Sequence, residues 1–154
     1  MINIVLVEPR IPQNTGNIGR LCVGSGAKLH LIKPLGFAID DKSVKRAGLD
    51  YWDDLDITIW DSLTHFHENN PINERHFFAT TKTKQNYFDV QFESGDFFYF
   101  GREDAGLPES LIDAHKQNTI TIPMNDKIRS INLANSVGII LYESIRQNYK
   151  DFDV

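Results

Sequence analysis

The residues that most constrain the fold lie at the beginning of the chain. Residues 2–8 read INIVLVE, a nearly continuous apolar run rich in β-branched side chains. A strand with one solvated face alternates apolar and polar residues, whereas a strand covered on both faces, as in a parallel sheet, is apolar almost throughout. The chain is therefore predicted to begin with a strand that is buried on both faces.

Strand and helix patterns alternate over the rest of the chain. Further strands are predicted at 28–33, 55–60, 75–81, 96–100 and 118–124. Helices are predicted at 15–27, 42–48, 61–69 and 107–115, and from about Asn132 to Tyr149, before a frayed tail. This alternation predicts an α/β fold with a mainly parallel sheet. No repeat and no linker-like composition interrupts it, so residues 1–154 are expected to form a single domain.

Composition and charge limit the possible partners and the cellular compartment only broadly. The net charge of −5 gives no support to nucleic-acid binding, although such binding follows local patches rather than totals. Cys22 is the only cysteine, which argues against a disulfide framework and favours a reducing, cytoplasmic compartment. The first ten residues carry no basic leader, and their apolar run is too short for a signal peptide or a membrane span.

Four loops that follow predicted strands are the candidates for a binding site. Ligands of parallel α/β sheets bind at the carboxyl ends of the strands. In this chain, glycine, proline, asparagine and charged residues crowd together in the loops that reach that edge. These loops are 9–20, 80–85, 101–108 and 123–132.

The first loop contains NTGNIGR, residues 14–20, which reads as a strand-to-helix turn. Asn14 or Thr15 can cap the helix, and Gly16 lets the backbone approach a ligand closely. The N–H groups of a helix start also suit an anion. The spacing matches neither the dinucleotide-binding fingerprint nor a P-loop.

Arg20 lies in the same motif. The buried helix face is predicted to consist of Ile18, Leu21 and Cys22. Arg20 then points to the opposite side and is expected near the mouth of the crevice with its charge free. The alternative is an ordinary capped helix with a solvated arginine.

The third loop, FGREDAGLP at 100–108, leaves an aromatic strand abruptly. Two glycines flank Arg102, Glu103 and Asp104, and glycines there allow backbone groups to contact a flat ligand such as an adenine. The alternative is a tight turn that carries a surface ion pair.

The fourth loop leads into the last helix with more polar side chains than a cap requires. Ser130, Asn132, Asn135 and Ser136 stand where one capping side chain is enough. They either bond a ligand and the neighbouring loops, or they simply overcap an exposed helix start and bind water.

Other chemistries find less support. The five histidines show no ligand spacing, a single cysteine excludes a thiolate zinc cluster, and no nucleophile-elbow signature is present. A metal site is therefore not expected. Two groups of cations could contact phosphates or could equally be solvated. They are Lys42, Lys45 and Arg46 on one predicted helix face, and Lys82 and Lys84 beside the second crevice loop.

Taken together, the motifs are specific. The chain carries, in order, EPRIPQNTGNIGRLC, GFAIDDKSVKRAGLDYW, FGREDAGLP and IPMNDKIRSINLANSVGIILYESIRQ. In this order they closely resemble the TrmL (YibK) group of the SPOUT superfamily, over essentially the whole chain. Members of this group are S-adenosylmethionine-dependent tRNA 2′-O-ribose methyltransferases that act on the wobble nucleotide of the anticodon.

The resemblance implies a fold, an assembly and a cofactor site. The fold is an α/β fold with a deep trefoil knot near the C-terminus, and the assembly is a homodimer built largely from the first and last helices. The cofactor, S-adenosyl-L-methionine with S-adenosyl-L-homocysteine as product, lies bent in the knot. Its implied contacts are Ala79 with Thr80 and Thr81, Gly101, Glu103, Ile122, Met124, Ser130 and Leu133.

The resemblance also implies the catalytic residues Arg20, Glu103, Ser130 and Asn132. Arg20 is expected to orient the ribose 2′-OH and to stabilise the developing alkoxide. The partner is the anticodon stem-loop of a tRNA, and no membrane is involved. Ala134 stands where relatives frequently have serine, a departure that bears on tRNA and base preference.

Three alternatives differ in class or target. The first is an RNA-binding protein of the same fold without catalysis, which would be expected to lose Arg20 or the cofactor loops. The second is a 2′-O-methyltransferase that acts on another RNA site. The third is a generic nucleotide-binding α/β enzyme, which would require a phosphate-binding motif.

Overall fold

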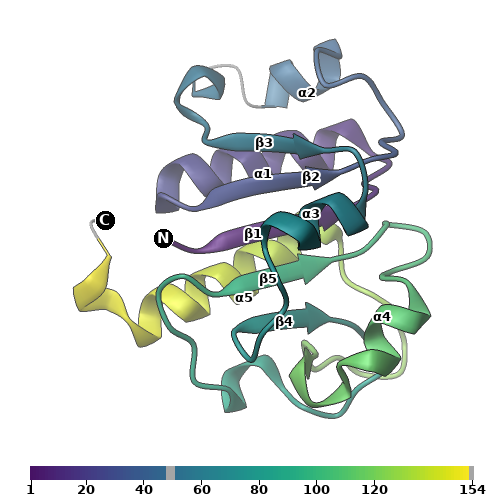
Figure 1. Ribbon diagram of the computed structural model, residues 1–154, viewed down its shortest axis with the longest axis vertical. Coiled ribbons are helices and arrows are strands. Elements are labelled where there is room, and N and C mark those ends of the chain that lie inside the picture. Colours follow the sequence, from purple (N-terminus) through teal and green to yellow (C-terminus); the bar gives the residue numbers. More distant parts are fainter. Residues whose placement is uncertain (48–50, 153–154) are drawn as a thin grey trace.

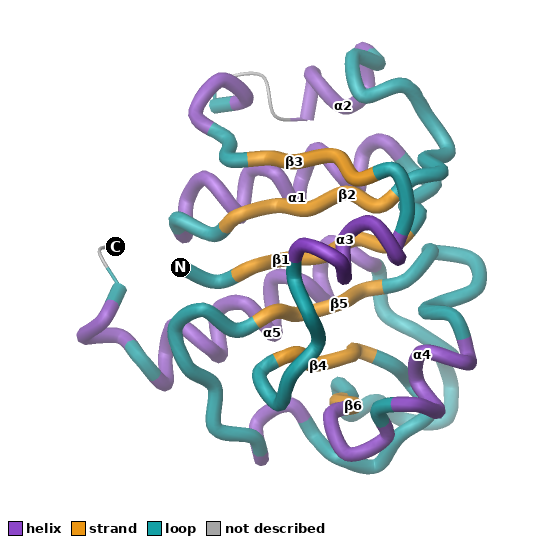
Figure 2. The backbone as a smooth tube through the Cα atoms, in the orientation of Figure 1, coloured by secondary structure: helices purple, strands orange, loops and turns teal. Residues whose placement is uncertain are grey.

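The computed structural model describes residues 1–47 and 51–152. Its centre is a six-stranded sheet with the strand order β3-β2-β1-β5-β4-β6 (Figures 1 and 2). Neighbouring strands pair parallel throughout the described sheet, which confirms the α/β class. The strands are β1 (Asn3–Val7), β2 (Lys28–Ile32), β3 (Ile57–Trp60), β4 (His76–Ala79), β5 (Phe97–Phe100) and β6 (Thr119–Ile120).

The first strand is buried on both faces, as its apolar run predicted, and it lies inside the sheet. β1 pairs with β2 on one side and with β5 on the other. Ile4, Val5, Leu6 and Val7 are all buried, because helices cover both faces of the sheet there. From β1 the sheet extends through β2 to β3 on one side, and the later strands β5, β4 and β6 lie on the other side. The carboxyl ends of β1 and β5 therefore form a topological switch point, where α/β sheets open a crevice.

Helices form a layer on each face of the sheet. In Figure 1, α1 (Pro12–Ser25) and α5 (Leu133–Gln147) lie behind the sheet, and α3 (Leu63–Asn69) lies in front of it. α4 (Glu109–Ala114) lies beside β4 in the lower part of Figure 1. α2 (Lys42–Ala47) packs beside α1. Short 3-10 turns occur at Trp52–Asp54, Tyr87–Asp89, Lys116–Asn118 and Tyr149–Asp151.

The face behind the sheet is packed with apolar side chains. Ile4 and Leu6 of β1 meet Ile18 of α1 and Val137 of α5 in one continuous core. The buried thiol of Cys22 belongs to the same core, and burial raises its pKa to about 12. Cys22 therefore acts as a small apolar side chain.

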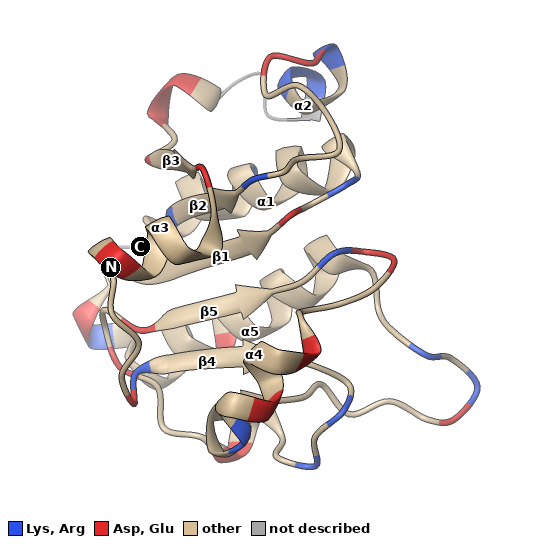
Figure 3. Ribbon diagram, turned by 45° about the vertical axis from the view of Figure 1, so that its right-hand side comes forward, with Lys and Arg blue, Asp and Glu red and all other residues tan. Residues whose placement is uncertain are grey.

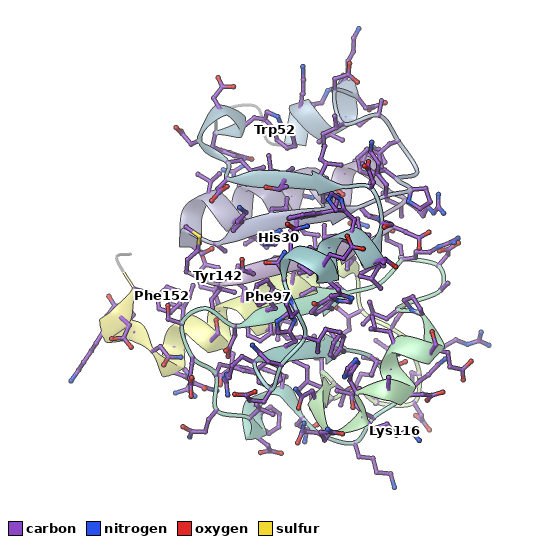
Figure 4. All side chains as sticks on the ribbon, viewed as in Figure 1. His30, Trp52, Phe97, Lys116, Tyr142 and Phe152 are labelled. Atoms are coloured by element: carbon purple, nitrogen blue, oxygen red, sulfur yellow. The ribbon has the colours of Figure 1, made fainter. Side chains whose placement is uncertain are left out.

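The front face mixes aromatic rings with buried histidines. Trp60 Nε1–H donates to His30 Nδ1 at 3.1 Å, and His30 Nε2 lies 2.9 Å from Asn3 Oδ1. An indole N–H can only donate, so Nδ1 carries no proton and His30 is neutral. Burial lowers the pKa of His30 to about 4, and Figure 4 shows this ring over the centre of the sheet.

A second histidine network lies beside the first. Tyr99 Oη lies 2.7 Å from His76 Nδ1 and 3.1 Å from His67 Nε2. Burial lowers the pKa of His76 to about 4 and raises that of the Tyr99 phenol. These histidines bond within the fold, and no cluster of metal-ligand geometry occurs among the described residues.

The observed elements correct three expectations about boundaries. The last strand was expected over 118–124 but contains only Thr119–Ile120, because the chain turns away to line a cavity and Pro123 has no N–H for a ladder. The tail is not frayed at Lys150–Phe152, where a 3-10 turn places Phe152 against the core; residues 153–154 lie outside the described part. The helix expected at 42–48 is observed as α2, Lys42–Ala47. Residues 48–50 lie outside the described part of the chain.

The start of α1 is the third correction. Asn14 and Thr15 were expected to cap this helix, but it begins at Pro12 with Ile11 as its N-cap. Proline suits the first helical turn because its missing N–H would have no intrahelical partner there. Asn14 and Thr15 are consequently inside the helix and buried against the sheet.

Candidate functional site

A cavity of about 390 Å³ opens at the carboxyl ends of β4, β5 and β6. Its walls come from the loops after these strands, from the start of α1 and from the first turns of α5. A volume of this size lies within the range of about 300–1,000 Å³ that small-molecule sites occupy. All four crevice loops picked out from the sequence, which lie far apart in the chain, thus meet around one space.

All the residues implied as cofactor contacts line this cavity. They are Ala79, Thr80, Thr81, Gly101, Glu103, Ile122, Met124, Ser130 and Leu133. Apolar side chains such as Phe100, Ile120 and Ile140 form part of its wall, and hydroxyl, amide and backbone groups form the rest. This mixture suits a ligand with a flat apolar part and several polar groups.

Glu103 ties the third loop to the start of α1. Its Oε1 accepts the backbone N–H of Arg10 at 2.8 Å, and its Oε2 accepts that of Ile11 at 2.8 Å. The Asn14 amide also donates to Oε2, at 3.3 Å. A carboxylate at a helix N-terminus satisfies N–H groups that have no partner in the helix and complements the positive end of its dipole. Glu103 thus closes one wall of the cavity.

Asn14 connects this wall to the last helix. Asn132 Nδ2 donates to Asn14 Oδ1 at 3.1 Å, while Asn132 Oδ1 accepts the backbone N–H of Asn135 at 3.1 Å. Asn14 is only 6% exposed, so its amide lies between Glu103 and Asn132 and is shielded from water. One buried amide therefore joins three segments that are distant in the sequence.

The surplus polar groups of the fourth loop divide into different roles. Asn132 caps α5, and Ser136 Oγ donates back to the carbonyl of Asn132 at 3.1 Å. The Asn135 side chain is exposed and contributes its backbone N–H to the cap. Ser130 lines the cavity, and its hydroxyl has no hydrogen bond to another described residue. Ser130 is thus available to a ligand.

The glycines of the third loop make a close backbone approach possible. A Cβ on Gly101 would lie 2.0 Å from both Gly106 C and Leu107 N, which no side chain tolerates. The loop folds back on itself through paired backbone hydrogen bonds between Arg102 and Gly106. Gly106 adopts φ = +74°, which glycine takes without strain. The space beside Gly101 is therefore filled by the backbone of Gly106 and Leu107, and Gly101 also lines the cavity.

The ion pair that the sequence offered as the alternative for this loop is also present. Arg102 Nε and Nη2 donate to the two carboxylate oxygens of Asp104 at 2.9 and 2.8 Å. The bidentate contact lowers the pKa of Asp104 and raises that of Arg102. The surface ion pair is therefore confirmed, while contact of this loop with a flat ligand stays a prediction; Arg102 pairs with Asp104, and Glu103 bonds to the start of α1.

Arg20 does not lie where the sequence placed it. It is exposed, but it is not among the residues that line the cavity. Because α1 begins at Pro12, Arg20 lies about 12 Å further along the helix. Its guanidinium is 5.0 Å from the centre of the Tyr51 ring, a cation–π contact, so its charge is not free.

The two groups of cations also lie apart. Lys82 lines the cavity and Lys84 is exposed on the same loop. Lys42, Lys45 and Arg46 are exposed on α2, at the opposite end of the molecule in Figure 3. The first group can reach a ligand of this cavity, whereas the second cannot reach it within the same chain.

The sequence interpretation missed the role of Asn14, and it did not name Ile11, Phe100 or Leu107 individually as part of the site. Asn14 looked like a helix cap, since asparagine before a helical pattern usually is one. Pro12 was the available signal, because proline favours the first helical turn and would have placed Asn14 inside the helix.

Comparison with known proteins gives the class of the fold and site. The model of the SpoU rRNA methylase family matches residues 1–142. The chain therefore belongs to the SpoU rRNA methylase family.

Two similar proteins narrow the comparison. The tRNA (cytidine(34)-2′-O)-methyltransferase of Escherichia coli K12 is 47% identical over 149 residues, covering 96% of this chain and 94% of the relative. A solved structure described as giving structural insights into the 2-OH methylation of C/U34 on tRNA is 41% identical, has a TM-score of 0.92 and covers 97% of each chain.

A more distant structure shares the fold. The SpoU methyltransferase AviRb from Streptomyces viridochromogenes, solved in complex with the cofactor AdoMet, has a TM-score of 0.80 at 23% identity. It covers 96% of this chain and 60% of that one. At this identity, the similarity concerns the fold alone.

Proposed function

We propose that this chain is a tRNA 2′-O-ribose methyltransferase that methylates the wobble nucleotide 34, cytidine or uridine, with S-adenosyl-L-methionine as methyl donor. The name of the Escherichia coli relative and the description of the C/U34 structure support this assignment. The observation that carries it in this chain is the cavity, since every residue expected to contact the cofactor lines it. Metal ions have no part in the proposal.

The residues of the cavity fit such a donor. Bound there, the cofactor supplies a methyl group on a sulfonium, which is already a good leaving group. Gly101 offers backbone groups to a flat ring, and Thr80, Ser130 and the backbone of Ile122 and Met124 offer polar groups. The apolar side chains of the wall keep water out. The main task of the chain is to hold the ribose 2′-OH in line with the methyl group.

The proposed catalytic residues fall into two groups: those that hold the cavity in shape and those that would contact the substrate or the methyl donor. Glu103 and Asn132 have their polar atoms engaged in bonds between loops, so they would act by fixing the shape of the cavity. Ser130 has a hydroxyl available inside it and would contact the acceptor nucleotide or the donor. Arg20 would orient the 2′-OH and stabilise the developing alkoxide.

The role of Arg20 depends on a homodimer. Arg20 does not line the cavity of its own chain, so it would have to act on the cavity of a partner. The exposed surface of α1 and α5 fits a two-fold contact: Tyr142 is 45% exposed and lies near Gly24 of α1 (Figure 4). We propose an apolar dimer interface there.

Further features of the proposal follow from the family. The 154 residues would act as one catalytic domain located in the cytoplasm. The segment from β6 to α5 would form a trefoil knot. No helix among the described residues has the length and apolar content needed to cross a membrane.

Transfer of labelled methyl to tRNA tests the activity and separates it from the alternatives. Total tRNA from cells that lack the gene is the substrate, and mass spectrometry of nuclease fragments locates the new methyl group. Methylation of the ribose of nucleotide 34 is the expected result. A methyl group at another nucleotide would replace the target, and RNA binding without any transfer would favour the non-catalytic alternative.

Arg20 is tested by substitution and by mixing. Arg20→Ala should lower methyl transfer by about 100-fold, the usual scale for a positioned group, and should leave the melting shift caused by S-adenosyl-L-homocysteine unchanged. Arg20→Lys should also be poor, since an ammonium does not reproduce the planar fork. If Arg20 acts on a partner, mixed dimers of Arg20→Ala and Glu103→Ala chains should regain part of the activity. Near-normal turnover of Arg20→Ala would remove it from the mechanism.

A further inference from the structure

We propose that residues 125–129 form an RNA-gripping loop in which Ile128 packs against an unpaired base and Lys127 and Arg129 bind the phosphates beside it. The inference rests on the proposed function and concerns how the RNA substrate is chosen. In Figure 3 this loop, between β6 and α5, projects far from the body of the molecule. All of residues 125–130 are exposed.

The loop begins and ends at the candidate site. Met124 precedes it and Ser130 follows it, and both line the cavity. A substrate whose reactive group enters the cavity must therefore pass beside residues 125–129. The position alone makes the loop a candidate for contact with the rest of the substrate.

The tip of the loop has a defined turn. The side-chain Oδ1 of Asn125 accepts the backbone N–H of Lys127 at 3.0 Å, an Asx turn across Asp126. This bond orders the tip just before Ile128.

Ile128 is the unusual residue at this tip. Its side chain is 53% exposed, and it belongs to a small group of large apolar side chains exposed on the described surface. One other member of that group, Ile11, lines the cavity. Ile128 lies outside the cavity lining but on a loop that begins and ends there, so a partner that packs on it would be the part of the substrate that stays outside the cavity.

The charges around Ile128 identify the chemistry of that partner. Lys127 and Arg129 form no ion pair with any described residue, and neither do Lys82 and Lys84 on the loop after β4. Arg10, Arg75 and Arg102, in contrast, are all paired with acids. Asp126 is the single acid of the loop. Unpaired cations that flank an apolar side chain at the rim of the site suit a polyanion with an apolar component.

An unpaired RNA segment is the nucleic acid that supplies both components. In a duplex the bases are stacked and paired, so an aliphatic side chain meets only phosphate and ribose. In a loop the bases can turn outward and present an apolar face. Ile128 would thus favour a hairpin loop over a stem, and the two cations would bind either one.

The experiment measures binding and turnover with two RNAs of equal length, an anticodon stem-loop and a fully paired duplex. The variants are Ile128→Ser, Lys127→Ala and Arg129→Ala. Ile59→Ser is the matched apolar control, since Ile59 is 36% exposed on the edge strand β3, and Lys150→Ala is the cationic control in the 3-10 turn after α5. The cofactor-induced melting shift and the mass by light scattering are recorded for each variant.

Ile128→Ser should weaken stem-loop binding and raise KM by about 10-fold, with little change in duplex binding. Lys127→Ala and Arg129→Ala should weaken binding of both RNAs, and each should reduce the slope of log K against log salt by roughly 0.7–0.9. Both controls and the cofactor-induced melting shift should match the unsubstituted protein.

Two results would overturn the proposal. One is that Ile128→Ser binds the stem-loop as tightly as the unsubstituted protein; the other is that it becomes monomeric, which would make the loop a subunit contact. Direct binding of the stem-loop keeps this test independent of turnover. A failed proposed function appears instead as an unsubstituted protein that binds the stem-loop and transfers no methyl group.

Discussion

The two loops that face each other across the cavity are built on opposite principles. Residues 101–107 bond to themselves and to α1, through the Arg102–Gly106 backbone pair and the three bonds accepted by Glu103. Residues 122–131 form no backbone-to-backbone hydrogen bond in the described structure and are mostly exposed. The first loop therefore contributes to the stability of the fold, whereas the second leaves its polar groups available to a ligand.

A binding cavity needs both kinds of loop. The cavity needs a wall that does not move, and the loop after β5 supplies it with glycine backbone and a partly buried carboxylate contact. It also needs groups that are not already satisfied, and the other loop, which precedes α5, supplies Ser130. Asn14 and Asn132 hold the two loops in a fixed relation.

The largest expected effect is from Gly101→Ala. The new Cβ would overlap backbone atoms of Gly106 and Leu107, so the hairpin must open at a cost of about 3 kcal/mol, and binding of S-adenosyl-L-homocysteine should be lost. Gly106→Ala is the control in the same loop: it meets only the strain of φ = +74°, about 1 kcal/mol, because its Cβ would point into open space. Urea unfolding measures both. Equal losses for the two variants would contradict the close-packed wall.

Removing the carboxylate of Glu103 should be the next largest change. Glu103→Ala leaves the N–H groups of Arg10 and Ile11 without their acceptor, and we expect a loss of about 2 kcal/mol in the free energy of unfolding. Glu103→Gln should lie in between, because its amide N–H₂ faces another donor. Asp104→Asn, which disturbs only the surface pair with Arg102, should leave the urea midpoint where it is. An unchanged midpoint in Glu103→Ala would show that the loop is not anchored through this side chain.

The connection between the loops should appear as a coupling energy. Asn14→Ala, Asn132→Ala and the double variant form a cycle, and the bond between the two amides should couple them by about 1 kcal/mol. Asn132→Ala alone should also lose the cap of α5, about 1 kcal/mol. Thermal or urea unfolding gives the three differences. Strict additivity would mean that the loops are held in place independently.

Ser130→Ala should have the smallest effect on stability and a clear effect on function. Its hydroxyl has no described partner, so unfolding should change by no more than about 0.5 kcal/mol. Cofactor binding or methyl transfer should nevertheless fall by roughly 10-fold, the loss expected when a ligand hydrogen bond is removed. Ser110→Ala, an exposed serine on α4, is the control. A silent Ser130→Ala in both assays would return this residue to the role of a solvated loop residue.

Local patterns predicted most of the elements and much of the cavity lining. The apolar run of β1, the helical spacing in α1 and α5, and the rule that ligands bind at strand ends led to the right loops. The errors fell where one local signal competed with another. Asn14 has the chemistry of a cap, but Pro12 starts the helix earlier and buries it; residues 121–124 have a strand pattern, but they leave the sheet to line the cavity.

By itself, the sequence determined the class of the fold, because a strand that is apolar on both faces requires a covered parallel sheet, and alternating patterns supply the covering helices. Only the tertiary structure decided what each polar residue does. Asn14, Glu103 and Asn132 meet because strands far apart in the chain end at the same edge of one sheet. Arg20 and Ser130 are separated because α1 runs from Pro12 away from the cavity, so that its later turns face another surface.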